Sequence, residues 1–398
     1  MPLQALLFVA LCVAAFSLLC SAFIVFSQHW HGKVSHDHNL LGVQKFHTAA
    51  VPRVGGVAIV VGMGLGLVLA GALHPAILQR LELRHVVLLL AASAPAFAAG
   101  MVEDLIKNVS VKVRMAATIV SPLLASFLMG STLTHLDLWG VDALLTMAPV
   151  AVLVTALAVA GGANAVNIID GFHGLSAGVV LVMSVALGAL GWAYQDGLIL
   201  LLATLAVSAT VGFLVFNYPA GKLFLGDGGA YFLGFWVAET AVLLMVRHPD
   251  ISAWQILAIC AYPVIEVLFS IFRRKYLSGQ APGQADALHL HTLVYRRIVL
   301  KRFVTSTWRQ GRGNAYVSLL IVPPVALLSG MAVMLGRPML VSMALVAFAT
   351  VAYISLYIAL VRRPHLRAVA TRQRPVVVAA NDLKPLGEAE GARRLLRG

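Results

Sequence analysis

The stretch NAVNIIDGFHGLSAG, from Asn164 to Gly178, decides the fold because it is a short polar insert between two long apolar runs. These runs cover residues 143–163 and 174–194. Because about 20 apolar residues of helix cross a hydrocarbon core, each run predicts one membrane-spanning helix. The polar residues between the runs are then expected where two spans meet the membrane surface.

The rest of the chain has the same character. Of its 398 residues, 60% are hydrophobic and only 11% are charged, whereas about a quarter are charged in soluble domains. Lipid leaves backbone polar groups without partners outside helices and closed barrels, and these runs are too long for barrel strands. We therefore predict an all-α polytopic membrane protein with 10–11 spans, in the runs 3–27, 54–73, 85–102, 115–131, 143–163, 174–194, 198–217, 229–246, 252–272, 315–335 and 339–361.

Basic residues divide unequally between the two sides that alternate spans define. With eleven spans, 25 of the 29 Lys and Arg fall on one side, which carries the loops 28–53, 103–114, 164–173, 218–228 and 273–314 and the C-terminal tail. Lys and Arg accumulate on the cytoplasmic side, so we predict a periplasmic N-terminus and a cytoplasmic C-terminus. We expect residues 1–361 to form one membrane domain and residues 362–398 a basic cytoplasmic tail. This bias explains the net charge of +13 without a nucleic-acid partner, aided by attraction to anionic lipid.

Acidic side chains gather on the same predicted cytoplasmic side. Glu103, Asp104, Asp170 and Asp227 stand at or near helix ends there. One acid at a helix end is ordinary, but a carboxylate near lipid is costly unless it is paired or metal-bound. Four on one face therefore indicate a site, and oxygen ligands in this number suit Mg²⁺ or Mn²⁺.

Cations and glycines accompany these acids. Glycines at Gly55–Gly56 and at Gly226–Gly229 open two predicted helices, whose N-termini can bind anions. Cationic side chains recognise phosphate, and those facing this side include Lys45, Arg53, Lys107, Lys112, Lys222, Arg273, His289 and His291. Together these features predict a site for a divalent metal and a polyanion such as a nucleotide diphosphate.

Two further acids lie inside predicted spans. Glu266 follows Pro263, and proline breaks or kinks a helix. A kinked helix can open a groove for a lipid chain, and in a transporter Glu266 would be a proton-relay acid. Glu239 is expected to pair with a polar neighbour in the bundle.

Five motifs follow one another between about residues 40 and 300. They are PRVGG at 52–56, an acidic pair with its Lys at 103–107, NAVNIIDG at 164–171, FNYP…KLFLGDGG at 216–229 and DALHLHTLVYRR at 286–297. In this order they resemble those of the polyprenyl-phosphate N-acetylhexosamine-1-phosphate transferases, glycosyltransferase family 4. The resemblance implies transfer of a sugar 1-phosphate from a UDP-sugar to undecaprenyl phosphate, with release of UMP. It also implies a multi-pass protein of the bacterial inner membrane with a cytoplasmic active site.

The resemblance also implies residue roles. Asp227 looks like the principal Mg²⁺ ligand, and Asp104 like a second ligand and the acid near the lipid phosphate, a candidate to deprotonate it. Glu103 and Asp170 look like further catalytic residues. Mn²⁺ is the alternative metal. The residues that look like substrate contacts are Asn164, Asn167, His173 and Asn217, the cations named above, and His289 and His291 near the diphosphate.

Three positions depart from the family pattern. Glu103 stands for the usual Asp, His173 for a second Asp, and Thr292 for the last His of the histidine motif. The departures argue against the peptidoglycan translocase and favour a transferase that begins a surface polysaccharide, such as the O-antigen of lipopolysaccharide. UDP-N-acetylglucosamine is the leading donor, with UDP-N-acetylfucosamine or UDP-N-acetylquinovosamine as runner-up. A transporter or flippase is the distant alternative, and the sequence leaves open whether two copies form a homodimer.

Overall fold

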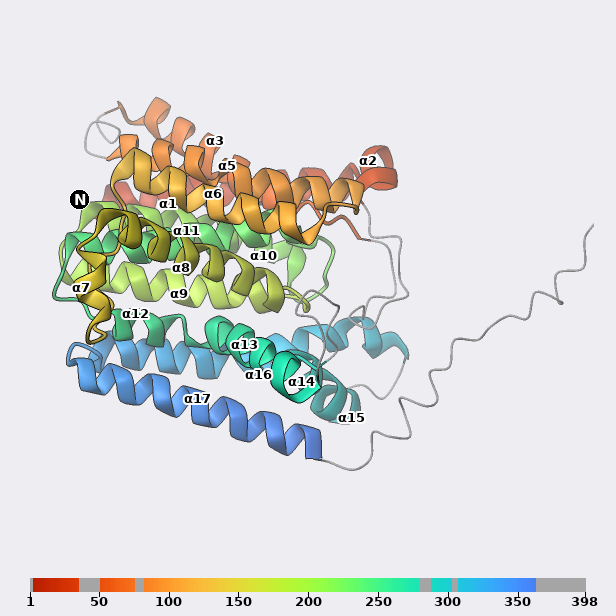
Figure 1. The fold of residues 1–398 in the computed structure, drawn as a ribbon. Helices are drawn as coiled ribbons and strands as arrows, with labels where there is room; N and C mark the ends of the chain where they lie inside the picture. The colour runs from red at the N-terminus through yellow and green to blue at the C-terminus, as the bar shows by residue number, and fades with distance from the viewer. Residues whose placement is uncertain (1–2, 36–50, 76–81, 279–287, 303–306, 363–398) are drawn as a thin grey trace, which may run out of the picture. The chain divides into compact units, whose positions relative to one another are not determined.

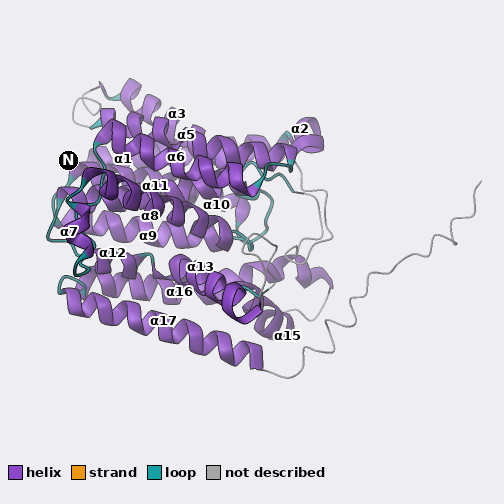
Figure 2. Ribbon diagram, viewed as in Figure 1, coloured by secondary structure: helices purple, strands orange, loops and turns teal. Residues whose placement is uncertain are grey.

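The computed structural model describes residues 3–35, 51–75, 82–278, 288–302 and 307–362. Within these ranges the regular structure is helical and contains no β-strand (Figure 2). The N-terminal half contains α1 (Leu3–Phe26), α2 (Gln28–Ser35), α3 (Gly55–Leu73), α5 (Leu83–Ile106), α6 (Val111–Met129), α7 (Val141–Leu145), α8 (Ala148–Ile169) and α9 (Leu175–Ala193). There follow α10 (Gly197–Asn217), α11 (Gly226–Arg247), α12 (Ala253–Ile259), α13 (Ala261–Phe272), η1 (Arg273–Ser278), α14 (Leu290–Val294), η2 (Tyr295–Val299), α15 (Leu300–Arg302), α16 (Thr307–Leu335) and α17 (Met339–Arg362).

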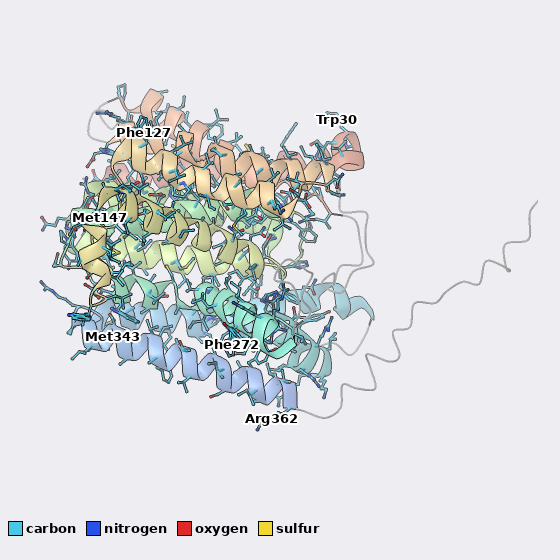
Figure 3. All side chains as sticks on the ribbon, in the orientation of Figure 1. Trp30, Phe127, Met147, Phe272, Met343 and Arg362 are labelled. Carbon is cyan, nitrogen blue, oxygen red and sulfur yellow. The ribbon has the colours of Figure 1, made fainter. Side chains whose placement is uncertain are left out.

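The long helices confirm the predicted spans. Ten described helices are long and apolar enough to cross a membrane, and the bent pair α12–α13 would make eleven. Large apolar side chains such as Phe127, Met147 and Phe272 are exposed on them or beside them (Figure 3). Extensive exposed apolar surface is typical of a protein that contacts lipid. The direction in which the chain crosses the membrane stays a prediction.

Helix α11 is the centre of the bundle. It packs against α3, α5, α8, α9 and α10 (Figure 1), and the side chains of Phe232, Phe235 and Trp236 are fully buried. Neighbouring helices cover most of the side chains of α11 along its length. The first turn of α11 is therefore held from several directions, and this turn carries Asp227.

Glycines let three helices cross at the start of α11. A Cβ atom on Gly56 of α3 would lie 2.5 Å from the Cα of Gly229. A Cβ atom on Gly100 of α5 would lie 2.5 Å from the Cα of Gly228. Small residues permit such backbone contact between helices in lipid. The crossing brings the last turn of α5 beside the first turn of α11.

The span that contains Pro263 is broken, as the sequence predicted. Helices α12 and α13 meet at an angle of 87°, and the break lies at Cys260, which ends α12 and precedes α13. Pro263 therefore falls in the first turn of α13, where a missing N–H removes no helical hydrogen bond. This explains why the break precedes the proline.

The chain divides into two compact units, Met1–Tyr357 and Ile358–Gly398. The first unit contains all helices up to α16 and most of α17. Of the second unit, the structure describes only the end of α17, as far as Arg362. Beyond Arg362, the predicted tail lies outside the described residues, and its division from the membrane domain at residue 361 stays a prediction.

Candidate active site

Asp104 is the buried acid of the site. Its Oδ1 accepts a hydrogen bond of 2.9 Å from the backbone N–H of Asp227, and its Oδ2 accepts one of 2.9 Å from Gly228. The first amides of a helix have no partner within the helix, and a negative charge there also stabilises the helix dipole. Asp104 thus caps α11 from a neighbouring helix and fixes the backbone that carries Asp227.

Asp227 faces two guanidinium groups. Arg114 donates from Nη1 to its Oδ2 at 2.6 Å, and Arg53 donates from Nη2 to its Oδ1 at 3.3 Å. The same Nη2 of Arg53 lies 3.6 Å from Oδ1 of Asp104. Arg53 therefore bridges the two carboxylates, and the site alternates negative and positive charges. Such fixed cations are what phosphate groups bind.

Backbone pairing explains why Arg53 reaches the site. The PRVGG segment lies along the residues before α11, joined by hydrogen bonds of 2.9 Å from Phe224 to Pro52, from Gly55 to Phe224 and from Gly56 to Leu225. Gly226 follows with a φ of +77°, and a Cβ atom there would collide with the carbonyl oxygen of Arg53. Only glycine satisfies both constraints. Two motifs far apart in the sequence thus form one local structure.

Asp170 is a third carboxylate at this end of the bundle. It follows the last residue of α8 and accepts a hydrogen bond of 2.5 Å from Ser176 Oγ. Its surface is partly exposed. Burial raises the pKa of Asp170 to about 6, although the hydrogen bond from Ser176 opposes the rise and the charges of Arg53 and Asp227 also act on it. Asp170 therefore changes charge close to neutral pH.

His289 and His291 form a buried pair. His289 precedes α14 in an extended conformation and His291 lies inside that helix. Their rings stack at 5.2 Å with an interplanar angle of 9°. The Nε2 atom of His291 would lie 3.5 Å from a Cβ atom on Gly171, and its ring is 5.7 Å from that of Phe172. The histidine motif thus contacts the NAVNIIDG turn, as a shared site requires.

Asn217 and His173 hold two loops together. Asn217 accepts a hydrogen bond of 2.7 Å from Gly174 N–H and donates one of 2.8 Å to Leu223 O. His173 is 95% buried, with Nδ1 3.2 Å from Pro219 O. These side chains contact protein, and in this structure they order the loop that precedes α11. Their predicted contact with substrate stays a prediction.

The other predicted residues are spread around this end. Asn164 donates to Thr118 Oγ1 at 3.0 Å and to Ala160 O at 2.8 Å, which joins α8 to α6. Glu103 accepts a hydrogen bond of 2.8 Å from Val109 N–H and so orders the loop after α5. Lys107, Lys112 and Lys222 are exposed, Asn167 is half-buried, Arg273 is buried, and Lys45 lies outside the described residues.

Two residues of the site have no signal of their own in the sequence. The sequence identifies Arg114 only as a topological charge, and it does not single out Ser176. Glu266 lies 2.9 Å from His289, a partner that the sequence does not predict, and its expected roles at a lipid groove or in proton relay stay predictions. Glu239 is expected to pair with a polar neighbour, and its carboxyl group lies beside the hydroxyl of Ser131, although neither carboxyl oxygen makes a hydrogen bond of regular geometry in the described part of the chain. No local signal in the sequence distinguishes Arg114 from its neighbour Lys112.

Asp227 and Asp104 are the residues of the site that could hold the predicted Mg²⁺ ion. No group of three or more His, Cys, Asp or Glu side chains suited to a metal occurs in the residues that the structure describes. Mg²⁺ usually takes one or two carboxylates and completes its shell with water and substrate phosphates. Asp227 already directs both oxygens at cationic groups, and Asp104 lies beside it. Mg²⁺ itself stays a prediction.

The fold and the site define a polytopic membrane protein with an acidic and cationic site at one end of a helical bundle. Residues 86–245 match the sequence profile of glycosyl transferase family 4, a range that contains Asp104, Asp170 and Asp227. This segment resembles the family that the motifs predicted, and the named relatives below support the same family.

Relatives with curated names agree with this assignment. The chain is 26% identical over 252 residues to a probable undecaprenyl-phosphate N-acetylglucosaminyl 1-phosphate transferase of Bacillus subtilis, covering 62% of this chain and 66% of the relative. It is 26% identical over 255 residues to the undecaprenyl-phosphate alpha-N-acetylglucosaminyl 1-phosphate transferase of Thermotoga maritima, covering 64% and 72%. It is 31% identical over 153 residues to the phospho-N-acetylmuramoyl-pentapeptide-transferase of Anoxybacillus flavithermus, covering 36% of this chain and 47% of the relative. The chain thus spans just under two thirds of the Bacillus relative and less than half of the Anoxybacillus one.

Proposed function

We propose that the protein transfers a sugar 1-phosphate from a UDP-sugar to undecaprenyl phosphate and releases UMP. The observation that carries the proposal is the cluster of Asp104, Asp227, Arg53 and Arg114 at the first turn of α11. It lies within a chain that resembles glycosyl transferase family 4 and whose relatives carry undecaprenyl phosphate in their names. The product is an undecaprenyl-diphosphate-linked sugar.

N-acetylglucosamine 1-phosphate is the group that we propose is transferred. The Bacillus and Thermotoga relatives, which match over more than 60% of this chain, are both named for N-acetylglucosamine. The muramoyl-pentapeptide transferase matches only 36% of it. UDP-N-acetylfucosamine and UDP-N-acetylquinovosamine are the alternative donors. The product would begin a surface polysaccharide such as O-antigen, at the cytoplasmic face of the inner membrane.

The reaction joins two anions, so charge repulsion is its first barrier. A phosphate oxygen of the lipid attacks the phosphorus next to the sugar, and the bond from that phosphorus to the bridging oxygen breaks, so that UMP leaves. Arg53 and Arg114 are held in place by Asp227, and preplaced cations lower the energy of such a transition state. Mg²⁺, when held by Asp227 and Asp104, would add charge neutralisation on the diphosphate.

Asp170 supplies a proton acceptor for this scheme. With a pKa of about 6, its carboxylate is mostly ionised at neutral pH. A phosphate monoester has a second pKa of about 6, so Asp170 is matched to accept the proton of a singly ionised lipid phosphate. Attack through a covalent aspartyl intermediate is the alternative route. In that case an acid of the site would itself receive the sugar phosphate.

The test is an assay of nucleotide release. Membranes containing the full chain are incubated with undecaprenyl phosphate, Mg²⁺ and a panel of UDP-sugars, and UMP and UDP are separated and measured. We expect one donor to release UMP, which identifies the sugar. No UMP should be released when undecaprenyl phosphate is left out. UDP would indicate ordinary glycosyl transfer and overturn the mechanism. Release of neither nucleotide from any donor would contradict the proposal.

A further inference from the structure

The histidine pair has an anchor inside the broken span. Glu266 belongs to α13 and its side chain is fully buried. Its Oε1 lies 2.9 Å from Nδ1 of His289, and the hydroxyl of Ser270 lies 3.2 Å from the same nitrogen. The backbone N–H of Leu290 donates to Oε1 at 3.2 Å and to Oε2 at 3.3 Å. One carboxylate thus binds both the first histidine and the amide that follows it.

This contact fixes the start of α14. Leu290 is the first residue of that helix, and its amide is one that the helix itself leaves without a partner. A carboxylate buried among apolar residues is costly unless a cation or donor faces it. Removing either member of the Glu266–His289 pair therefore disturbs the other. Glu266 and the segment 289–290 are held as one unit.

The same contacts continue to the Asp170 turn. Oε2 of Glu266 lies 3.9 Å from Nδ1 of His291, whose ring stacks on His289. The opposite side of the His291 ring, at Nε2, points to Gly171. Glu266 and the residue after Asp170 thus lie at the two ends of one row of contacts. The row joins α13 to the turn between α8 and α9.

We propose that Glu266 is a positioning residue for sugar-phosphate transfer, which holds His289 and His291 against the Asp170–Gly171 turn. The inference rests on the proposed function, because it assigns Glu266 to that same site. Glu266 acts through the histidines and contacts none of the reacting groups itself. Glu266, a polar residue of the span that the 87° break interrupts, thus has its partner outside that span.

The test compares Glu266→Gln with Glu266→Asp and with a matched control. Gln keeps the size of the side chain and removes its charge, whereas Asp keeps the charge. Glu239→Gln is the control, because Glu239 is an equally buried glutamate of a span that lies outside the site. We expect Glu266→Gln to lower kcat/KM by about 10- to 100-fold, mainly through kcat, because small misplacements have effects of this size. Asp should restore part of the loss, and Glu239→Gln should stay close to wild type.

A double variant distinguishes positioning from general damage. If Glu266 acts through His289, Glu266→Gln combined with His289→Asn should lose little more than either single variant. Full additivity of the two losses, or a kcat/KM for Glu266→Gln within about threefold of wild type, would overturn the inference. So would a loss that Glu239→Gln reproduces.

A second readout does not depend on activity. Hydrogen exchange of the segment 288–295, followed by mass spectrometry, reports the amide of Leu290. Glu266→Gln should speed that exchange, and Glu239→Gln should not; unchanged exchange would overturn the inference. If the wild-type protein transfers no sugar phosphate, the proposed function fails, and the exchange measurement still decides whether Glu266 holds the histidine segment.

Discussion

The backbone N–H of Asp227 donates a 2.9 Å hydrogen bond to the carboxylate of Asp104, so the first acid of the site sets the position of the second. The two acids have different surroundings. Asp104 is fully buried and bound by helix amides, whereas Asp227 is 14% exposed and bound by arginines. Loss of Asp104 should therefore disturb structure and chemistry together, and loss of Asp227 chemistry alone.

Asp227→Asn is expected to lower turnover by about 100- to 1,000-fold, the size of effect seen when one electrostatic contact to a transition state is removed. Thermal unfolding in detergent should stay near wild type. Asp104→Asn should lose activity and also about 1–3 kcal/mol of stability, because an amide nitrogen would face backbone donors. Asp250→Asn is the control. Asp250 follows the C-terminal end of α11, opposite to Asp227, and its carboxylate accepts a hydrogen bond from Tyr194. Turnover of Asp227→Asn within a few-fold of wild type would contradict its assignment.

Arg114→Lys is expected to lower kcat/KM by about 10-fold or more, because lysine cannot reproduce the planar geometry of a guanidinium. Arg114→Gln should lose more. The effect should exceed that of Lys112→Gln, since Lys112 is exposed while Arg114 contacts Asp227 at 2.6 Å. UMP release at varied UDP-sugar concentration measures each variant. Arg84→Gln, an exposed change at the other end of α5, provides the baseline.

The rate should fall as the pH drops through about 6, where Asp170 becomes protonated. Ser176→Ala removes a hydrogen bond that lowers this pKa, so the acid limb of the kcat/KM profile should move to higher pH.

The contribution of Asp170 to the free energy of unfolding should change with pH in the opposite direction to the rate. Because the folded-state pKa lies above the ordinary 3.8, the contribution of Asp170 to stability is fully present below pH 3.8 and is lost as pH rises through about 6. An acid limb that is unchanged in Ser176→Ala would argue against Asp170 as the titrating group.

Gly100→Ala is expected to destabilise the protein by about 1–3 kcal/mol, the usual effect of inserting a methyl group into a packed contact. Its Cβ would meet the backbone of Gly228 and push α5 from α11, so activity should fall as well. Gly64→Ala is the matched control in a helix, since apart from its chain neighbours and its own helix backbone no described atom lies within 4 Å of its Cβ position. That change should be neutral or stabilising by up to about 1 kcal/mol. Equal unfolding temperatures for the two variants would contradict close packing at Gly100.

The membrane spans were predictable from sequence because apolar length alone determines them. The break near Pro263 was also predictable, since proline has a fixed local effect. The gathering of Asp104, Asp170 and Asp227 at one end followed from counting spans. These features depend on composition and on positions along the chain, which the sequence displays directly.

The partners within the site were not predictable in the same way. Arg114 and Lys112 lie two residues apart in the first turn of α6. The placement of α6 against α11 decides that Arg114 is the one that contacts Asp227. Glu266 precedes His289 by 23 residues, and they meet because the chain returns to α13 at the start of α14. Such pairings depend on the angles between helices, which periodicity and motif order do not contain.

The glycine crossing has a consequence for changing the substrate of this protein. Because Gly56, Gly100, Gly228 and Gly229 bring backbones into contact, the spacing of Asp104 and Asp227 is independent of side-chain choice and tolerates little variation. New donor preferences then have to arise outside the crossing, for example in the turn that carries His173 and in α14, which carries Thr292, two positions that depart from the family pattern. An engineer seeking another sugar should leave the crossing untouched and vary those two segments, so that the reaction is kept while the donor preference changes.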